Sequence, residues 1–151
     1  TTTCSGSSFD KCFCAFFRGR PIAFTAVFHL MHPSGLMWKE HRTVCLPDFQ
    51  GIGIGNALSN FVASAYSGIR GRKYTSVTAN PAMVAYRAKS PLWKMTRKPQ
   101  VNIANVKVKR MKHRKKGVNA FRQSFTTDRV TASFRYVGPR NPDAAKKLGI
   151  S

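Results

Sequence analysis

The sequence predicts a single α/β domain of the α+β type, in which a mixed and mostly antiparallel sheet is flanked by helices. The 151 residues are the size of one domain with a sizeable core, and 42% of them are hydrophobic. Aromatic-rich segments with a strand pattern come first, and segments with a helical period of apolar residues follow. The expected order of elements is β-β-β-α-β-α-β-β.

The first third of the chain predicts three strands after a polar lead-in over residues 1–10. Strands are expected at residues 11–18, 22–31 and 38–46, because these segments are rich in aromatic and β-branched residues. Residues 19–21, Gly-Arg-Pro, can turn the chain, so the first two strands form a hairpin. Pro47 ends the third strand.

Helices are predicted in the middle of the chain, where the hydrophobic period changes. A short β-rich segment at residues 74–79 separates them. Asn80 and Pro81 begin the second helix, which runs to about residue 89, because Asn is a good N-cap and Pro suits the first helical position. The first helix is indicated by apolar residues that recur at three- and four-residue steps: Leu58, Phe61, Val62, Ala65, Tyr66 and Ile69.

The last third of the chain has a weaker pattern. Residues 101–108 alternate loosely and predict a strand, and residues 129–137 predict a clearer one. The domain is therefore expected to span residues 11–137. A C-terminal tail at residues 138–151 is expected to contain one helical turn.

The net charge is the most unusual property of the composition. Twenty-six Lys and Arg residues stand against five carboxylates and give a formal charge of +21. A field of this strength attracts polyanions, so we expect RNA, DNA or a nucleoprotein as a partner, with a merely solvated basic surface as the alternative. The densest basic run has no apolar face to bury and is the predicted nucleic-acid-binding segment: Lys107, Lys109, Arg110, Lys112, Arg114, Lys115 and Lys116.

Membrane and metal-binding functions have no support in the sequence. No apolar run approaches the roughly 20 residues of a membrane span, so no membrane partner is expected. The four cysteines form no Cys-x-x-Cys pair, and no second pair lies at zinc-finger distance, so no metal site is expected. Reduced thiols in a cytoplasmic protein are the expectation.

A glycine-rich loop, QGIGIG at residues 50–55, stands between the third predicted strand and the first helix. Loop amides and an open helix start form an anion site, and glycine lets the backbone approach a phosphate without a Cβ in the way. The loop lacks the Gly-Lys-Ser/Thr ending of a P-loop, because Asn56 follows Gly55. The dinucleotide fingerprint Gly-x-Gly-x-x-Gly also fails, because positions 56 and 58 are not glycine.

The remaining pattern, Gln/Arg-x-x-Gly-x-Gly/Ala, resembles the coenzyme A pyrophosphate loop of the GNAT superfamily of N-acetyltransferases. Gln50, Gly53 and Gly55 match it in full. The resemblance covers roughly residues 11–137 and implies acetyl-CoA as the cofactor, whereas a turn that only links strand to helix is the alternative. The residues that it implies in cofactor binding lie in the strand end, the loop and the second helix start: Val44, Cys45, Leu46, Gln50, Gly51, Ile52, Gly53, Ile54, Gly55, Asn56 and Asn80.

The match to this superfamily is incomplete. Its domains normally begin with a strand and one or two helices that roof the acceptor groove, whereas only about ten residues precede the first strand predicted here. We therefore expect these elements to be missing, lost or supplied by a longer chain. The segment SPLW at residues 90–93 stands where the superfamily usually has Gly-Phe. Together with LPDFQGIGIG and ANPAM, it resembles acetyltransferase-type domains attached to larger bacterial or phage-borne ATP-binding chains.

Two residues are implied as the catalytic pair. A base must take the proton of the attacking amine, and Glu40, the only Glu in the chain, lies on the strand before the loop. His41 points to the other face of that strand and is the alternate base. Tyr86 resembles the superfamily's Tyr that protonates the coenzyme A thiolate, although its spacing from Asn80 is one residue short. The alternatives are a surface Glu paired with a basic residue and a Tyr that packs on the sheet.

The leading functional hypothesis is an acetyl-CoA-dependent N-acetyltransferase that transfers the acetyl group directly to a primary amine, on an acceptor associated with an anionic partner. The second hypothesis is a non-catalytic nucleic-acid-binding module on the same scaffold, with residues 107–116 as its main phosphate-binding segment. A third hypothesis combines the two, with an aminoacyl-tRNA or a ribosomal protein as the acceptor.

Overall fold

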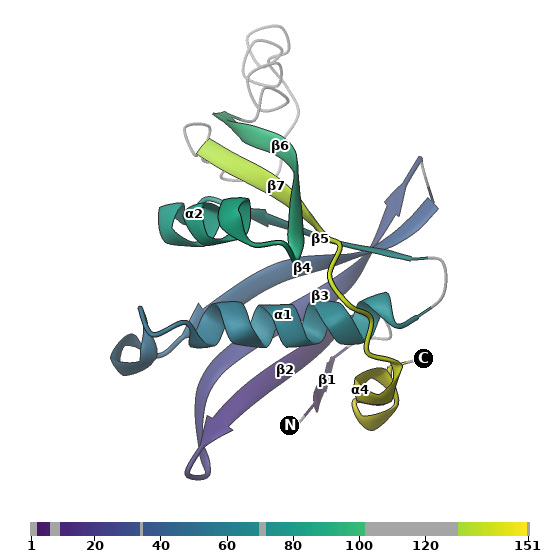
Figure 1. Ribbon diagram of the computed structural model, residues 1–151. Helices are drawn as coiled ribbons and strands as arrows, with labels where there is room; N and C mark the ends of the chain where they lie inside the picture. Colours follow the sequence, from purple (N-terminus) through teal and green to yellow (C-terminus); the bar gives the residue numbers. More distant parts are fainter. Residues whose placement is uncertain (1–2, 7–9, 34, 70–71, 102–129, 151) are drawn as a thin grey trace, which may run out of the picture.

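The centre of the molecule is a seven-stranded sheet in the order β1-β2-β3-β4-β5-β7-β6 (Figure 1). A computed structural model of the chain describes residues 3–6, 10–33, 35–69, 72–101 and 130–150. Neighbouring strands of the sheet are antiparallel, except that β4 and β5 are parallel. Because a parallel pair needs a crossover connection, the helix that joins β4 to β5 must lie across one face of the sheet.

The strands are β1 (Thr3–Gly6), β2 (Asp10–Phe17), β3 (Arg20–His32), β4 (Gly35–Cys45), β5 (Lys73–Thr78), β6 (Trp93–Val101) and β7 (Val130–Tyr136). The helices are α1 (Ile54–Ser67), α2 (Pro81–Lys89) and α4 (Pro142–Lys147), and a 3-10 turn, η1 (Pro47–Phe49), follows β4. None of the described helices is long and apolar enough to cross a membrane.

The predicted fold class, a mixed and mostly antiparallel sheet flanked by helices, is confirmed. Two strands differ from the prediction: β1 lies within the segment expected to be a polar lead-in, and β6 begins at Trp93, well before residue 101. Pro99 and two register shifts against β7 interrupt β6, so its sequence lacks a regular alternation. Beyond Val101, the strand predicted at 101–108 and the basic segment at 107–116 lie outside the described residues.

Local backbone geometry explains the long β2-β3-β4 meander. The β2–β3 turn is formed by Arg18 and Gly19, whose φ angles are both positive, at 48° and 76°. Two consecutive residues of this kind make the hairpin turn whose twist matches that of the flanking strands. A register shift against β3 gives β4 one extra residue, His41, between Glu40 and Arg42. Such a bulge increases the local twist of the strand.

The three helices pack on one face of the sheet, which we call the helix face (Figure 1). On this face α1 crosses β3, β4, β5 and β7, and α4 packs against α1. Aromatic rings fill the space beneath α1: the ring of Tyr66 lies 5.8 Å from that of Phe13 and 4.6 Å from that of Trp38. The opposite face, which we call the helix-free face, is covered by none of the described helices.

The parallel pairing of β4 with β5 is short, and this shapes the site. It runs only from Met37 with Lys73 to Glu40 with Ser76. Beyond that point β4 stays with β3 as far as Cys45, whereas β5 continues alongside β7 as far as Thr78. The two central strands therefore diverge, and we call the opening between them the fork.

Candidate functional site

A cleft of about 850 Å³ opens at the fork, between the end of β4, the start of α1 and α2. Two residues predicted to bind the cofactor do not line it: Ile52 is 69% exposed, and the Leu46 amide donates to the carbonyl of Ile22 on β3, at 2.8 Å. The other predicted residues do line it, together with Tyr86: Val44, Cys45, Gln50, Gly51, Gly53, Ile54, Gly55, Asn56 and Asn80.

The glycine loop is held open by its own backbone. Gly51 and Gly53 have φ angles of 80° and 90°, in the left-handed region that other residues rarely adopt. A Cβ at either position would meet no atom within 4 Å, so the space above both residues is open to a ligand. Gln50 closes the other side of the loop, because its Nε2 donates to the carbonyl oxygen of Cys45 at 3.0 Å.

Gly55 has a packing role as well. A Cβ at this position would lie 3.0 Å from the Sγ of Cys45, so a larger residue would have to displace the thiol by a few tenths of an ångström. The Cys45 side chain packs against the core, and burial raises the pKa of its thiol. Cys45 is therefore a packing residue of the cleft wall, which agrees with its apolar surroundings.

The start of α1 is an anion site. Its N-cap is Gly53, no side chain caps it, and no acidic residue stands in its first turn. The first amides of a helix have no intrahelical acceptor, and the helix dipole favours negative charge beside them. Among the described residues, the buried side-chain oxygen of Asn56 has no hydrogen-bond donor, so the cleft wall also contains an unpaired acceptor. A ligand with a phosphate group and N–H or O–H donors fits both features.

A hydrogen-bonded chain of three side chains orients Tyr86. The indole Nε1 of Trp93 donates to the Asn60 Oδ1 at 2.7 Å, and the Asn60 Nδ2 donates to the Tyr86 hydroxyl at 3.0 Å. An indole N–H can only donate, so the Asn60 amide must turn its oxygen to Trp93 and its NH2 to Tyr86. The Tyr86 oxygen is therefore an acceptor in this bond, and the Tyr86 hydroxyl proton can be donated to another group. The sequence reasoning missed Asn60.

Asn80 is a helix cap. Its Oδ1 accepts hydrogen bonds from the backbone amides of Ala82 at 2.9 Å and Met83 at 3.2 Å. Asn80 lines the fork cleft as predicted, but its oxygen is committed to the start of α2. This capping bond fixes where α2 begins and so places Tyr86 one and a half turns later beside the cleft.

Glu40 does not reach the cleft. Its side chain is 4% exposed, and one carboxylate oxygen accepts a hydrogen bond from the Arg87 Nη2 at 2.9 Å. Burial alone would raise the pKa of Glu40, but the Arg87 guanidinium and hydrogen bonds from Ser76 and Thr43 outweigh it and hold that pKa below its ordinary value. A carboxylate that is buried, paired and hard to protonate is a poor proton acceptor for an amine in the cleft, and this geometry corrects the prediction of Glu40 as the base.

Arg87 joins the elements around the fork. It is fully buried, and besides Glu40 on β4 it donates to Ser76 on β5, at 2.5 Å, and to Ser59 on α1, at 2.7 Å. Its guanidinium carbon lies 4.1 Å from the ring centre of Trp93 on β6. The sequence predicted pairing with a basic residue only as the alternative for Glu40, and at the surface, without identifying Arg87 as the partner. The only Glu of the chain on a central strand was the available signal, since a buried carboxylate needs a basic partner.

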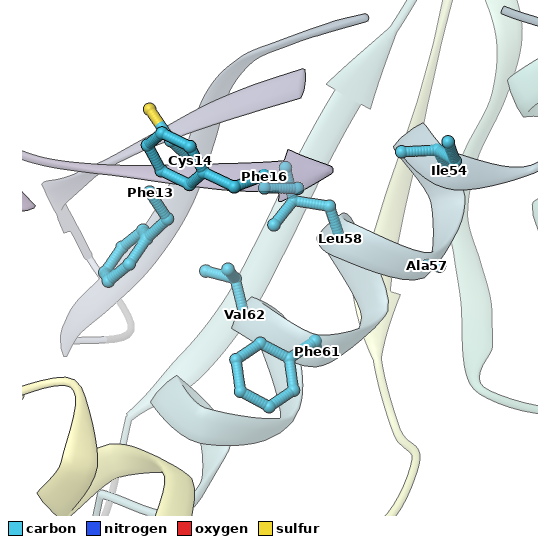
Figure 2. Close-up of a pocket in the computed structure, with 9 residues that line it drawn as sticks. Phe13, Cys14, Phe16, Ile54, Ala57, Leu58, Phe61 and Val62 are labelled. Atoms are coloured by element: carbon cyan, nitrogen blue, oxygen red, sulfur yellow. The ribbon is translucent and has the colours of Figure 1, made fainter. Parts of the chain in front are cut away.

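A second hollow, of about 440 Å³, lies between β2 and α1 (Figure 2). Its walls are apolar, with Phe13, Phe16, Phe61 and Val62 among them. The sulfur of Cys14 is directed away from Val62 and Phe61 (Figure 2). No charged side chain lines this hollow among the described residues.

The remaining predicted features are not placed by the structure. The basic segment at residues 107–116 lies outside the described residues. Within the described part of the chain, no group of three or more His, Cys, Asp or Glu side chains could hold a metal ion.

No protein-family model and no curated protein sequence matches the chain. Among solved structures, it is similar to an acetyltransferase from Bacillus subtilis in complex with CoA, with a TM-score of 0.56, 8% identity, and coverage of 83% of this chain and 75% of that one. It is similar to NAA60 of Arabidopsis thaliana in complex with a bisubstrate analogue, with a TM-score of 0.55, 15% identity, and coverage of 87% of this chain and 78% of that one. It is also similar to the KacTA–DNA complex, with a TM-score of 0.51, 10% identity, and coverage of 95% of this chain and 75% of that one.

The geometry and these similarities agree on one architecture. A glycine loop between a strand and a helix is the feature that the sequence resemblance implied, and the structure adds a parallel pair of strands that diverges beside it. At such low identity, the similarity concerns the fold. The chain has the fold of the GNAT acetyltransferases.

Proposed function

We propose that the protein is an N-acetyltransferase that uses acetyl-CoA and acetylates a primary amine by direct transfer. The observation that carries this proposal is the open, uncapped start of α1 at the mouth of the fork cleft, with the left-handed Gly51 and Gly53 before it. An anionic ligand is favoured there, and the cleft leads from that point along the unpaired end of β4.

Each part of the cofactor would have its own residues. The backbone amides of residues 51–55 would hold the pyrophosphate. The exposed edge of β4 at residues 43–45, which β5 leaves unpaired, would bind the pantetheine arm as an added strand. The buried Asn56 oxygen would accept a hydrogen bond from the arm. This division also explains why the glycines and Asn56 stand in one cleft.

When bound, acetyl-CoA supplies an activated acetyl thioester, and the reaction leaves the amine acetylated and coenzyme A as a thiol. Tyr86 is the proton donor in this proposal. Its oxygen accepts from Asn60, so its hydroxyl proton is available to a leaving sulfur in the cleft. The largest part of the rate enhancement would come from holding the two reactants together.

The base is assigned to His41. It is exposed, and it occupies the first position on β4 after the last residue that pairs with β5. The bulge turns it to the helix-free face, where its ring packs edge-on against Phe28 with centroids 5.5 Å apart. Within the described residues, no carboxylate or imidazole lines the cleft itself. We therefore propose that the amine arrives from the helix-free face and loses its proton there.

The acceptor is proposed to be an amine on a molecule associated with an anionic partner in the cytoplasm. The net charge of +21 supports the partner. A non-catalytic nucleic-acid-binding module is the competing function, because the same charge would serve it equally well. Only an acetyl-transfer measurement separates the two.

The test is thiol release from acetyl-CoA in the presence of a panel of amines: free amino acids, polyamines, peptides and aminoacylated RNA. An N-acetyltransferase releases thiol and forms the acetylated amine in equal amounts, and His41→Ala loses rate mainly at low pH, where the amine is protonated. If the protein binds acetyl-CoA and no amine in the panel accelerates thiol release, the proposed acceptor class is wrong. If it also fails to bind acetyl-CoA, the catalytic function is wrong.

A further inference from the structure

The helix-free face of β4, β5, β7 and β6 is strongly basic. Residues that pair directly across neighbouring strands project from the same face of a sheet, so the printed pairings assign each side chain to a face. Glu40 and Trp38 of β4 face the helices, and Lys39 between them faces away. The basic side chains of the helix-free face, which together we call the basic sheet face, are Lys39, His41, Arg42, Lys73, Lys94, Arg97 and Arg135.

One cross-strand row runs through the middle of this face. Phe28 pairs with Lys39, Lys39 with Thr75, Thr75 with Arg135, and Arg135 with Lys94. The row therefore crosses five adjacent strands, β3, β4, β5, β7 and β6, which lie about 4.8 Å apart. The row has the Phe28 ring at one end, and three of its other four residues are Lys or Arg.

Within the described strands, no carboxylate balances the charges on this face. Glu40 is the only acidic residue in the sequences of β4, β5, β6 and β7, and it is buried on the helix face. Arg135 and Lys94 stand directly opposite each other, although like charges in this position destabilise a sheet. By contrast, α1 has no charged residue in its 14 positions. The cations that the strand pairings place on this face therefore have no carboxylate of β4, β5, β6 or β7 beside them.

We propose that the basic sheet face binds single-stranded nucleic acid. Its long cationic side chains can contact phosphates, and the hydroxyls of Thr131 and Ser133 on the same face can donate to phosphate oxygens. Phe28 supplies a ring on which a base can stack, already flanked by the Lys39 Nζ at 5.7 Å from its centre and by the His41 ring. Cationic tracks with stacking rings are the usual means of binding a single strand.

The shape and composition of the face favour a single strand over other polyanions. The major groove of duplex DNA admits a helix or a two-stranded ribbon, whereas this face is five strands wide. An acidic protein would need apolar anchors at the centre of its interface, and the centre of this face is Lys39, Thr75 and Arg135. A single strand needs only phosphate contacts and exposed rings.

The location of this face connects it with the fork. His41, assigned above as the base, lies at the edge of the basic sheet face, two residues beyond Lys39 along β4. An amine carried by a nucleic acid on this face would therefore approach the fork from the side opposite the glycine loop. This inference rests on the proposed function for its anionic acceptor, but the binding itself is measured without acetyl-CoA.

The experiment measures the binding of a labelled single-stranded RNA and the matching DNA by fluorescence anisotropy over a series of salt concentrations. The test variant is Lys39→Gln/Lys94→Gln/Arg135→Gln. The matched control, Lys89→Gln/Lys146→Gln/Lys147→Gln, removes the same charge from exposed positions on α2 and α4. Thermal melting of both variants shows that each is folded.

We expect the test variant to bind at least about tenfold more weakly, with a salt slope reduced by about 2, because three phosphate contacts are lost. The control should change the affinity much less. A second variant, Phe28→Leu, keeps every charge and should weaken single strands but not duplexes. Equal losses in test and control variants, a preference for duplex, or a loss confined to Lys112→Gln/Arg114→Gln/Lys115→Gln/Lys116→Gln would overturn the proposal. Retained binding in Gly53→Glu shows that the result is independent of acetyl-CoA binding.

Discussion

The hydrogen-bonded chain from Trp93 through Asn60 to Tyr86 is the most informative arrangement at the scale of single residues. The indole can only donate, and this one-way donor fixes the direction of both bonds. A tyrosine whose oxygen already accepts a hydrogen bond is prepared to give up its proton on the other side. The arrangement supports the acid role proposed for Tyr86 and gives Asn60 a positioning role.

Tyr86→Phe should lower kcat by about a hundredfold, because the leaving thiolate loses its proton donor. The KM for acetyl-CoA should change little, since the ring remains in the cleft wall. Steady-state kinetics of thiol release measure both constants. Tyr136→Phe, which removes a hydroxyl bonded to the Pro139 carbonyl away from the cleft, is the control. An unchanged kcat in Tyr86→Phe means that another group protonates the thiolate.

Tyr86 and the predicted loop residues other than Ile52 lie in one cleft, because their sequence positions determine where they lie in this fold. The resemblance did not find Asn60 or Arg87. Both act through partners more than 25 positions away in the chain, Asn60 through Tyr86 and Trp93, Arg87 through Glu40 and Ser59. Such contacts depend on how the helices pack over the sheet, and local sequence patterns do not contain that information.

Among the structural elements, the close approach of α1 to the end of β4 sets the width of the fork cleft. Gly55 makes it possible, because a Cβ there would lie 3.0 Å from the Cys45 Sγ. The sequence resemblance explained this glycine by ligand contact. The structure adds a packing requirement between two elements of the protein itself.

A double-mutant cycle tests this packing requirement. Gly55→Ala should destabilise the protein in the natural background, because the added methyl group overpacks against the thiol, by about 1–3 kcal/mol. In a Cys45→Ala background the same substitution should cost about 1 kcal/mol less or become favourable, since Ala is the better helix former. Urea unfolding gives the four free energies. Equal effects of Gly55→Ala in the two backgrounds would show that the thiol does not limit the approach.

The ion pair of Glu40 and Arg87 holds β4 to α2 at the base of the fork. Replacing Glu40 by Gln should lower the free energy of unfolding by about 3–5 kcal/mol, because it leaves a buried guanidinium without its counterion. The double variant Glu40→Leu/Arg87→Met should be more stable than Glu40→Gln. If Glu40→Gln is as stable as the natural protein, the pair is not structural and the base role for Glu40 returns.

The same pair predicts a pH dependence. The pKa of Glu40 is lower in the folded protein than its ordinary value of 4.5, so the unfolded chain binds the proton more readily in acid. The stability that the pair contributes is complete above the ordinary value and is lost as the pH falls toward the lowered one. Unfolding free energies measured through the acid range should therefore fall more steeply for the natural protein than for Glu40→Leu/Arg87→Met. Parallel curves would contradict the lowered pKa.

The helices and strands could be predicted where the apolar residues recur regularly or where a capping or turn residue marks an end. The α1 period, the Asn80-Pro81 start of α2 and the β2–β3 turn were all read from sequence. β1 and β6 could not be, because β1 is formed of small polar residues and Pro99 breaks the alternation of β6. Both lie at the edges of the sheet, where pairing with a single neighbour demands less of the sequence.

The molecule as a whole has two faces of different chemistry. On the helix face, uncharged α1 and the glycine loop line the cleft to which we assign a small anionic cofactor. On the helix-free face, the basic sheet face offers cations to a larger anion. The fork lies between them, so an acetyl donor and an amine acceptor can approach the same point from opposite sides. The net charge indicated an anionic partner. The strand pairings add which basic side chains of the sheet share one face.

The central claim is that the open start of α1 binds the pyrophosphate of acetyl-CoA, and isothermal titration tests it most directly. Gly53→Glu places a carboxylate at the anion site, and the matched control Gly19→Glu introduces the same charge and the same positive-φ strain in the β2–β3 turn. We expect acetyl-CoA to bind the natural protein and Gly19→Glu with about micromolar affinity, near −8 kcal/mol, and not to bind Gly53→Glu. Equal binding by the two variants, or equal binding of acetyl-CoA and ATP by the natural protein, would contradict the claim.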